Sequence, residues 1–223
     1  MTEERHLWSG RFAQAPDQGV FEFQASFRFD CRLLEDDVEG SLAWMEALMD
    51  AGVLSADDST AITEGLTAIR DCARQDPGFL SGADEDVHAF VERQLIDRIG
   101  EVGLRLHTGR SRNEQVSLDL RLYVRRRLKE IQRAVVDLTA ALADQAEAAG
   151  DALMPAYTHL RRAQPMLAGH FFLAHAAALR RDHARLAHAR DEADALPLGS
   201  GAVAGTSYAI DTNRLATRLG FSR

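Results

Sequence analysis

VRRRLKEIQRAVVDLTAAL, residues 124–142, is the stretch that decides the fold. Its apolar side chains alternate at intervals of four and three residues, which is the spacing of a contact seam between helices that pack lengthwise. No proline or glycine interrupts residues 113–149, so we expect one helix about 50 Å long at ~1.5 Å per residue. Such a helix needs partner helices and predicts a helical bundle. The seam consists of Val124, Leu128, Ile131, Val135, Leu138 and Leu142.

Helical patterns also fill the segments on either side of this helix. An apolar stripe predicts a helix over residues 31–51, Ser55 is a suitable N-cap for a second, and the acids ending at Asp86 precede a third. After the long helix, Pro165 fits the first turn of another long helix. No strand-like alternation extends beyond a few residues. The sequence therefore predicts an all-α, mainly helical fold.

The charge and apolar content exclude several classes of protein. The 223 residues carry a net charge of −8, which argues against a general nucleic-acid binder. No apolar run approaches ~20 residues, and the N-terminus lacks the apolar core of a signal peptide. The two cysteines, Cys31 and Cys72, stand alone and indicate thiols rather than a disulfide framework. We therefore expect a soluble, cytoplasmic protein with no membrane or nucleic-acid partner.

The first polar segment is HTGRSRNEQ, residues 107–115, at the start of the long helix. Hydroxyls, an amide and a guanidinium beside a helix N-terminus suit a ligand that carries a carboxylate. A polar cap followed by a surface turn explains the same residues, and their spacing alone does not separate the two interpretations. The candidate side chains are Thr108, Ser111, Arg112 and Asn113.

The second polar segment is YTHLRRAQP, residues 157–165. A histidine beside a hydroxyl, as in Thr158–His159, is suited to general acid–base chemistry near neutral pH. A loop histidine with one structural hydrogen bond is the alternative. A second segment of this kind in one chain favours the catalytic interpretation.

Two further segments have structural explanations. DEDVH, residues 84–88, lacks the pattern of a calcium loop, and helix capping by its acids leaves His88 one turn into the helix. GSGAVAG, residues 199–205, follows a helix rather than a strand and does not have GxGxxG spacing, so a tight turn explains it better than a dinucleotide site. No two of the eight histidines stand four residues apart, and no zinc site is expected.

Six segments together resemble the argininosuccinate lyases of the fumarase/aspartase superfamily. They are LWSGRF (7–12), ASFRFD (25–30), DEDVH (84–88), LHTGRSRNEQ (106–115), YTHLRRAQP (157–165) and PLGSGAVAG (197–205). Glu114, Ala156 and Arg161 depart from the commoner family residues, which are aspartate, glycine and glutamine. The resemblance implies an N-terminal helical domain over 1–106 and the first long helices of a central bundle over 107–223. The family's third motif, a loop of the form GSSxMPxKxN, is absent from these residues, and we expect the 223-residue chain to be inactive alone.

The family reaction reversibly eliminates argininosuccinate to arginine and fumarate without a cofactor. By resemblance His159 is the acid–base histidine and Thr158 binds substrate beside it, while Asn113, with Ser111 and Arg112, holds a carboxylate. The resemblance also implies a homotetramer in which subunits share active sites. Substrate contacts are further expected from Ser26, Thr108, His88 and Gln164.

Two alternatives stay open. One is another succinyl-type lyase of the superfamily, such as adenylosuccinate lyase, although HTGRSRN argues against that enzyme. The other is a non-catalytic helical protein, like the lens crystallins derived from this enzyme, or an inert fragment. The motifs would survive in a recently repurposed copy.

Overall fold

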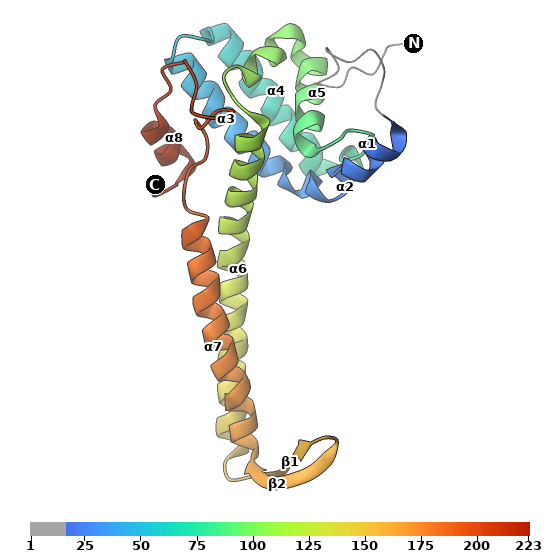
Figure 1. The fold of residues 1–223 in the computed structure, drawn as a ribbon, viewed down its shortest axis with the longest axis vertical. Coiled ribbons are helices and arrows are strands. Elements are labelled where there is room, and N and C mark those ends of the chain that lie inside the picture. Colours follow the sequence, from blue (N-terminus) through green and yellow to red (C-terminus); the bar gives the residue numbers. More distant parts are fainter. Residues whose placement is uncertain (1–16) are drawn as a thin grey trace. The chain divides into compact units, whose positions relative to one another are not determined.

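A computed structural model describes residues 17–223, which form helices and one small two-stranded sheet (Figure 1). The segment LWSGRF lies outside the described residues. The elements are α1 (Gln18–Gln24), α2 (Phe27–Asp30), η2 (Cys31–Leu33), α3 (Leu34–Asp50), α4 (Ala56–Gln75), η3 (Pro77–Phe79), α5 (Val87–Ile99), η4 (Gly100–His107), α6 (Arg112–Ala149), β1 (Leu153–Thr158), β2 (Arg161–Leu167), α7 (Ala168–Glu192) and α8 (Thr212–Leu219). The prediction of a mainly helical fold is confirmed.

The chain divides into two compact units. Among the described residues, the first contains 17–121 and 196–223, and the second contains 122–195. Helix α6 begins in the first unit and continues into the second. These units are defined by how densely their residues contact one another, whereas the domains expected over 1–106 and 107–223 follow from the family resemblance. The expected domain boundaries therefore stay a prediction.

The helix starts follow local capping chemistry. Ser55 accepts a hydrogen bond from the Asp58 N–H, and the Asp58 carboxylate accepts one from the Ser55 N–H, which is a capping box at the head of α4. At the head of α5 the Asp86 carboxylate accepts from the Ala89 N–H at 2.6 Å. Both helices begin where the sequence predicts, because an N-cap depends only on residues close to it in the chain.

The core of the first unit lies between α3, α4 and α5, with α8 also packed on α3. Trp44, Ile62, Phe90 and Leu95 are fully buried there. The Trp44 indole donates a hydrogen bond to the Thr108 carbonyl at 3.2 Å. The core thereby fixes the segment that leads into α6.

The second unit leaves much of the predicted seam uncovered within one chain. Leu128 is buried, but Ile131 is 44% exposed and Leu138 is 52% exposed. Helices α6 and α7 are joined by a contact from the Arg190 guanidinium to the Gln132 side-chain oxygen at 3.4 Å. The apolar face formed by Ile131 and Leu138 therefore has no cover from α7.

Residues 153–167 correct the prediction that YTHLRRAQP leads directly into a helix. They form an antiparallel hairpin in which Pro155 pairs with Pro165, and α7 begins only at Ala168. The placement of Pro165 in a first helical turn was therefore wrong. A two-stranded hairpin has two edges, so a proline without an N–H is tolerated in either strand. All side chains of the hairpin are at least partly exposed, and no apolar alternation marks it in the sequence.

In the part of the chain that the structure describes, no helix is both long and apolar enough to cross a bilayer. Cys31 and Cys72 are free thiols, as expected.

The Trp44 contact predicts a stability effect. Trp44→Phe removes the indole N–H and part of the ring, so it leaves a small void and a carbonyl without its donor. We expect a loss of about 1–3 kcal/mol in the free energy of unfolding, measured by urea denaturation. Phe23→Leu, at a side chain that is 92% exposed, is the control and should change stability by less than about 0.5 kcal/mol. Equal midpoints for the two variants would contradict this role of Trp44.

Candidate active site

The segment HTGRSRNEQ forms the entry to α6, and its short side chains cap that helix. The Ser111 hydroxyl accepts a hydrogen bond from the Asn113 N–H at 3.3 Å, and the Glu114 carboxylate accepts from the Ser111 N–H at 2.9 Å. This is a variant of the capping box, in which the hydroxyl accepts the N–H of the second helical residue rather than the third. Asn113 is exposed in the first turn, and Thr108 and Ser111 are half-buried. A carboxylate that approaches this turn would meet an amide, hydroxyls and the positive end of the helix dipole.

A buried ionic cluster lies beneath this helix start. The His88 Nδ1 atom is 2.9 Å from Asp37 Oδ1 and 3.1 Å from Asp119 Oδ2. The three side chains come from α5, α3 and α6, and none is more than 2% exposed. One imidazole thus joins three helices of the first unit.

The cluster is built to hold charge. Burial alone would lower the pKa of His88, but the hydrogen bonds and charges of Asp119 and Asp37 raise it to about 10. Burial would raise the pKa of Asp37, yet His88 and Arg110 lower it to about 2. Burial and the Asp37 charge together raise the pKa of Asp119 well above its usual value. The imidazole is therefore an imidazolium at neutral pH, held by an ionised Asp37.

Arg110 adds a second cation to the same region. Its guanidinium donates to the Ser41 hydroxyl at 3.1 Å, and its charge acts on both Asp37 and Asp119. Beside it, burial and the charge of Arg110 lower the pKa of His107 to about 4. His107 is consequently neutral at physiological pH.

Arg112 is held by neighbours rather than left free. It donates to Glu92 at 3.0 Å and to the Gln115 side-chain oxygen at 3.0 Å. Gln115 in turn donates to Asp37 at 2.5 Å. The guanidinium that we expect to help hold a carboxylate is therefore linked through one amide to the buried cluster.

Ser26 lies next to the start of α5. Its N–H donates to the Glu85 carbonyl at 2.7 Å, and its hydroxyl donates to the Asp30 carboxylate. The other oxygen of Asp30 accepts from the Val87 N–H at 3.0 Å. The segments ASFRFD and DEDVH, far apart in sequence, are thereby joined.

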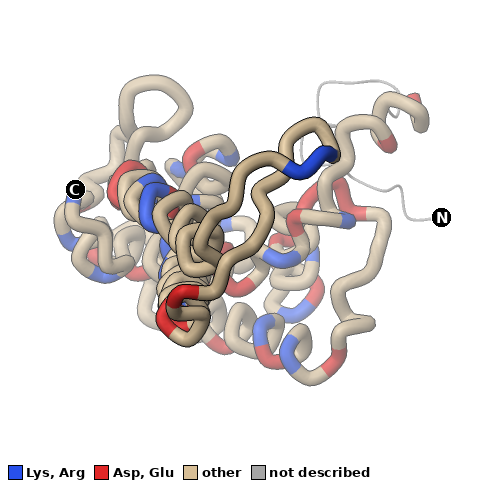
Figure 2. Tube along the Cα trace, turned by 90° about the horizontal axis from the view of Figure 1, so that it is seen from below, with Lys and Arg blue, Asp and Glu red and all other residues tan. Residues whose placement is uncertain are grey.

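The hairpin carries the remaining candidates. Thr158 and Gln164 are exposed on its strands, and His159 and Leu160 form the two-residue turn with φ of 49° and 59°. Both residues adopt the left-handed region, as a type I′ turn requires, which is uncommon and costly for side chains other than glycine or asparagine. Arg161 and Arg162 follow at the start of β2, and Figure 2 shows basic residues in blue near the tip of the hairpin.

The predicted site residues therefore fall in two groups. Six lie in the first unit around the starts of α5 and α6, and three lie on the hairpin of the second unit. His88 contacts two aspartates in the interior, so its assignment as a substrate contact stays a prediction, as do the other assignments. The first group comprises Ser26, His88, Thr108, Ser111, Arg112 and Asn113, and the second comprises Thr158, His159 and Gln164.

Among the described residues one set of side chains has the spacing of metal ligands. The ligand atoms of Asp37, His88 and Asp119 lie within 4.8 Å of one another. His88 and Arg110 already supply positive charge to this set, and the adjoining cavity has a volume of only about 10 Å³, roughly the space of one water molecule. The chemistry of the set fits an internal ion pair better than a resident cation.

Sequence reasoning missed the acids and the arginine of this cluster. Asp37 stands one turn after Leu34 and one turn before Ser41, on the buried face of α3. An acid on an apolar helix face indicates a buried partner, but the sequence does not say which one. Glu114 was recognisable, because Ser111 and Glu114 have the S-x-x-E spacing of a capping box.

Comparison with known proteins agrees with this architecture. A family model described as lyase matches residues 10–223. The chain belongs to this lyase family. This family is part of the fumarase/aspartase superfamily, so the predicted membership of that superfamily is confirmed.

Solved structures of lyases share the fold. An EDDS lyase in complex with formate is 25% identical, with a TM-score of 0.74 over 94% of this chain and 42% of its own. A fumarate lyase from Mesorhizobium sp. BNC1 is 22% identical, with a TM-score of 0.66 over 94% of this chain and 50% of its own. A fumarate lyase:delta crystallin from Brucella melitensis is 17% identical, with a TM-score of 0.67 over 95% and 47%. The chain thus spans half the length of these proteins or less.

The raised pKa of His88 predicts how stability depends on pH. Because the folded state keeps a proton on His88 up to pH about 10 while the unfolded chain loses it near 6.5, unfolding releases a proton in this window. The stabilisation is complete below the unfolded pKa and declines as the pH rises, by up to about 1.4 kcal/mol per unit. His88→Asn should remove this part of the slope, which urea denaturation between pH 6.5 and pH 10 measures. Parallel curves for the two proteins would contradict the assignment.

Proposed function

We propose that this protein is an argininosuccinate lyase, which cleaves argininosuccinate to arginine and fumarate in arginine biosynthesis. The observation that carries the proposal is the geometry of HTGRSRNEQ. Asn113 is exposed and Ser111 half-buried at the first turn of α6, and Arg112 beside them is braced by Glu92 and Gln115. A rigid set of donors at a helix N-terminus suits a succinyl carboxylate, on which negative charge grows during the elimination.

The lyases with known structures support carboxylate chemistry. The EDDS lyase structure holds formate, and a variant of EDDS lyase that is 26% identical to this chain holds fumarate. Both ligands are small carboxylates. The proposal extends this chemistry to the present chain because it shares the fold and has hydroxyl and amide donors at a capped helix start.

The reaction needs a base and an acid. The base removes a proton from the succinyl carbon next to the carbon that bears the guanidino nitrogen, and the carbanion is stabilised as an aci-carboxylate. An acid then protonates the departing guanidino group. We assign acid–base work to His159 and substrate contacts to Thr158, with Gln164, Ser26, Thr108 and His88 as further contacts. The exposed turn of the hairpin leaves His159 accessible to substrate.

We further propose that the protein is a homotetramer in which subunits complete each other's active sites. The uncovered apolar face around Ile131 and Leu138 supports this, because contiguous exposed apolar surface marks an association site. The candidate residues lie on two units of the chain, and shared sites would combine them.

A fumarate-release assay with several substrates separates the possibilities. We expect turnover of argininosuccinate and none of adenylosuccinate or EDDS, followed by the ultraviolet absorbance of fumarate. The assay compares two proteins. One is the 223-residue chain alone, and the other, the extended protein, is this chain followed by a family segment that includes the GSSxMPxKxN loop. We expect activity only from the extended protein. Turnover of another succinyl compound alone would replace the proposed substrate, and turnover of none by the extended protein would favour the crystallin-like alternative.

The assignment of His159 predicts a kinetic effect in the extended protein. His159→Asn should lower kcat by ~10²–10⁴, as expected for the loss of a general acid or base. His188→Asn, at an exposed position on α7, is the matched control and should retain the parental kcat. Near-normal turnover by His159→Asn would exclude His159 from the chemistry.

The proposed assembly predicts that charge on the uncovered face weakens association. The double variant Ile131→Lys, Leu138→Lys should raise the dissociation constant at least ~100-fold, because burying unpaired ammonium groups costs about 3 kcal/mol or more. Light scattering across a dilution series measures the oligomeric state. Leu104→Lys, at an exposed position of the first unit, is the control. An unchanged tetramer in the double variant would place the interface elsewhere.

A further inference from the structure

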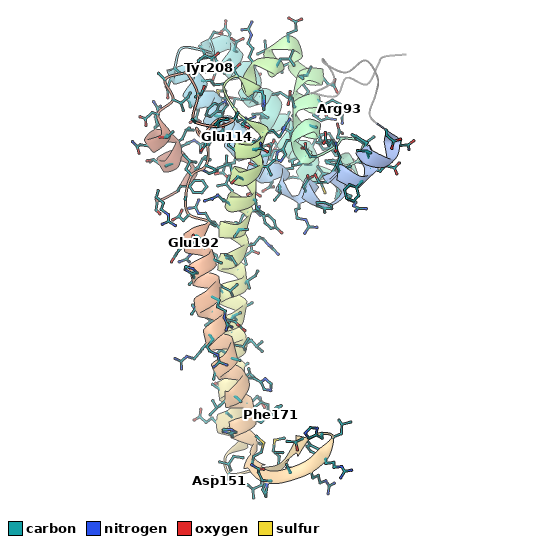
Figure 3. The ribbon with its side chains drawn as sticks, viewed as in Figure 1. Arg93, Glu114, Asp151, Phe171, Glu192 and Tyr208 are labelled. Carbon is teal, nitrogen blue, oxygen red and sulfur yellow. The ribbon has the colours of Figure 1, made fainter. Side chains whose placement is uncertain are left out.

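Glu114 makes contacts that neither the capping of α6 nor the proposed chemistry explains. One carboxylate oxygen accepts the Ser111 N–H at 2.9 Å as part of the capping box. The other accepts the N–H groups of Gly199 and Gly201, each at 2.8 Å. Glu114 is only 4% exposed. One carboxylate therefore joins the start of α6 to residues 197–205, which we call the glycine loop (Figure 3).

The glycine loop presents the N–H groups of Gly199 and Gly201 to one carboxylate oxygen, in the manner of an anion-binding nest. Gly199 has φ +101° and Gly201 has φ +61°, so both adopt conformations that other residues rarely take. A Cβ at Gly201 would lie 2.3 Å from the Gly205 carbonyl oxygen, and one at Gly199 would lie 2.6 Å from the Thr212 methyl group. Only glycine fits at either position. The resulting turn directs two N–H groups at one point, as in backbone sites for phosphate and carboxylate.

A second contact holds the same two segments together. A Cβ at Gly109 would lie 2.7 Å from the ring of Tyr208 and 2.9 Å from the Thr206 hydroxyl. The chain just beyond the glycine loop therefore lies directly against Gly109. Residues 199–208 therefore contact the segment HTGRSRNEQ at two points, Gly109 and Glu114. Ser111 and Asn113 lie between these two points in the sequence.

We propose that the glycine loop is a carboxylate-binding nest, occupied by the chain's own Glu114, and that Glu114 is a positioning residue for the substrate-binding turn. The carboxylate supplies an acceptor to three N–H groups at once, and it fixes the turn that presents Ser111 and Asn113. A small free carboxylate fits the same nest when the Glu114 side chain is absent. The effect on turnover rests on the proposed function, but the binding property of the nest does not.

The test compares two substitutions that remove different features of Glu114. Glu114→Ala deletes the carboxylate and leaves space for formate. Glu114→Gln keeps the size but puts an NH₂ group in place of one acceptor, so at least one N–H loses its partner and no space is created. Glu130→Ala is the control, since Glu130 is an exposed acid on the same helix with a partner three residues away at Arg127.

Hydrogen exchange of the peptide that covers residues 198–205 is the first readout, and it requires no catalysis. We expect exchange to be at least ~10-fold faster in both Glu114 variants than in the parent protein and in Glu130→Ala, because an amide without its acceptor opens more readily. Formate should slow the exchange again in Glu114→Ala and leave Glu114→Gln unchanged. Sodium chloride at the same ionic strength should have no such effect.

Turnover of the extended protein is the second readout. We expect kcat/KM to fall ~10–100-fold in Glu114→Ala, as displacement of a binding turn does, and to recover with formate but not with chloride. A purely structural role would not produce recovery specific to a carboxylate. Exchange and turnover that stay at the parental level in Glu114→Gln, or a lack of any formate response in a folded Glu114→Ala, would overturn the proposal. If the parent releases no fumarate, the proposed function fails, while hydrogen exchange still decides whether the nest binds carboxylate.

Discussion

The His88 imidazolium held between Asp37 and Asp119 is the interaction on which the first unit depends. It joins α5, α3 and α6 in the interior, where an unpaired charge would cost several kcal/mol. Each member is therefore tolerated only while the others are in place. The same requirement reaches the surface, because Gln115 links Asp37 to Arg112 and so sets the direction of a side chain at the entry to α6. The buried cluster is thus linked by two hydrogen bonds to a side chain at the entry to α6.

Much of the fold could be predicted from the sequence because helices depend on local signals. The Ser55 cap, the acids before α5 and the uninterrupted run of α6 all act within a few residues of chain. The hairpin could not be predicted in this way. Its strands bury little apolar surface, and its turn uses His159 and Leu160 where glycine or asparagine would have marked a turn. A histidine and a leucine in left-handed conformations indicate that something other than local stability selects these residues.

The candidate site could be predicted from the sequence only in part, for a related reason. The polar side chains of HTGRSRNEQ were evident from composition, and their position at a helix start was correct. Their partners were not evident, because Asp37 is 78 residues from Gln115 and Gly201 is 87 residues from Glu114. Pairings over such separations depend on the packing of helices and have no sequence spacing of their own. A single sequence does show where a charged residue, such as Asp37, falls on an otherwise apolar helix face. Such a position indicates a buried partner without identifying it.

The two units place opposite demands on their polar residues. In the first, charges are buried, paired and fixed by three helices, which suits the binding of a substrate whose carboxylates must not move while charge develops on them. In the second, His159 stands on an exposed two-residue turn, and we propose acid–base work for this side chain. The proposed elimination requires both environments at one substrate. In the assembly that we propose, a bundle of several chains formed through the uncovered face at Ile131 and Leu138 would stabilise α6 and bring the hairpin of one chain to the first unit of another.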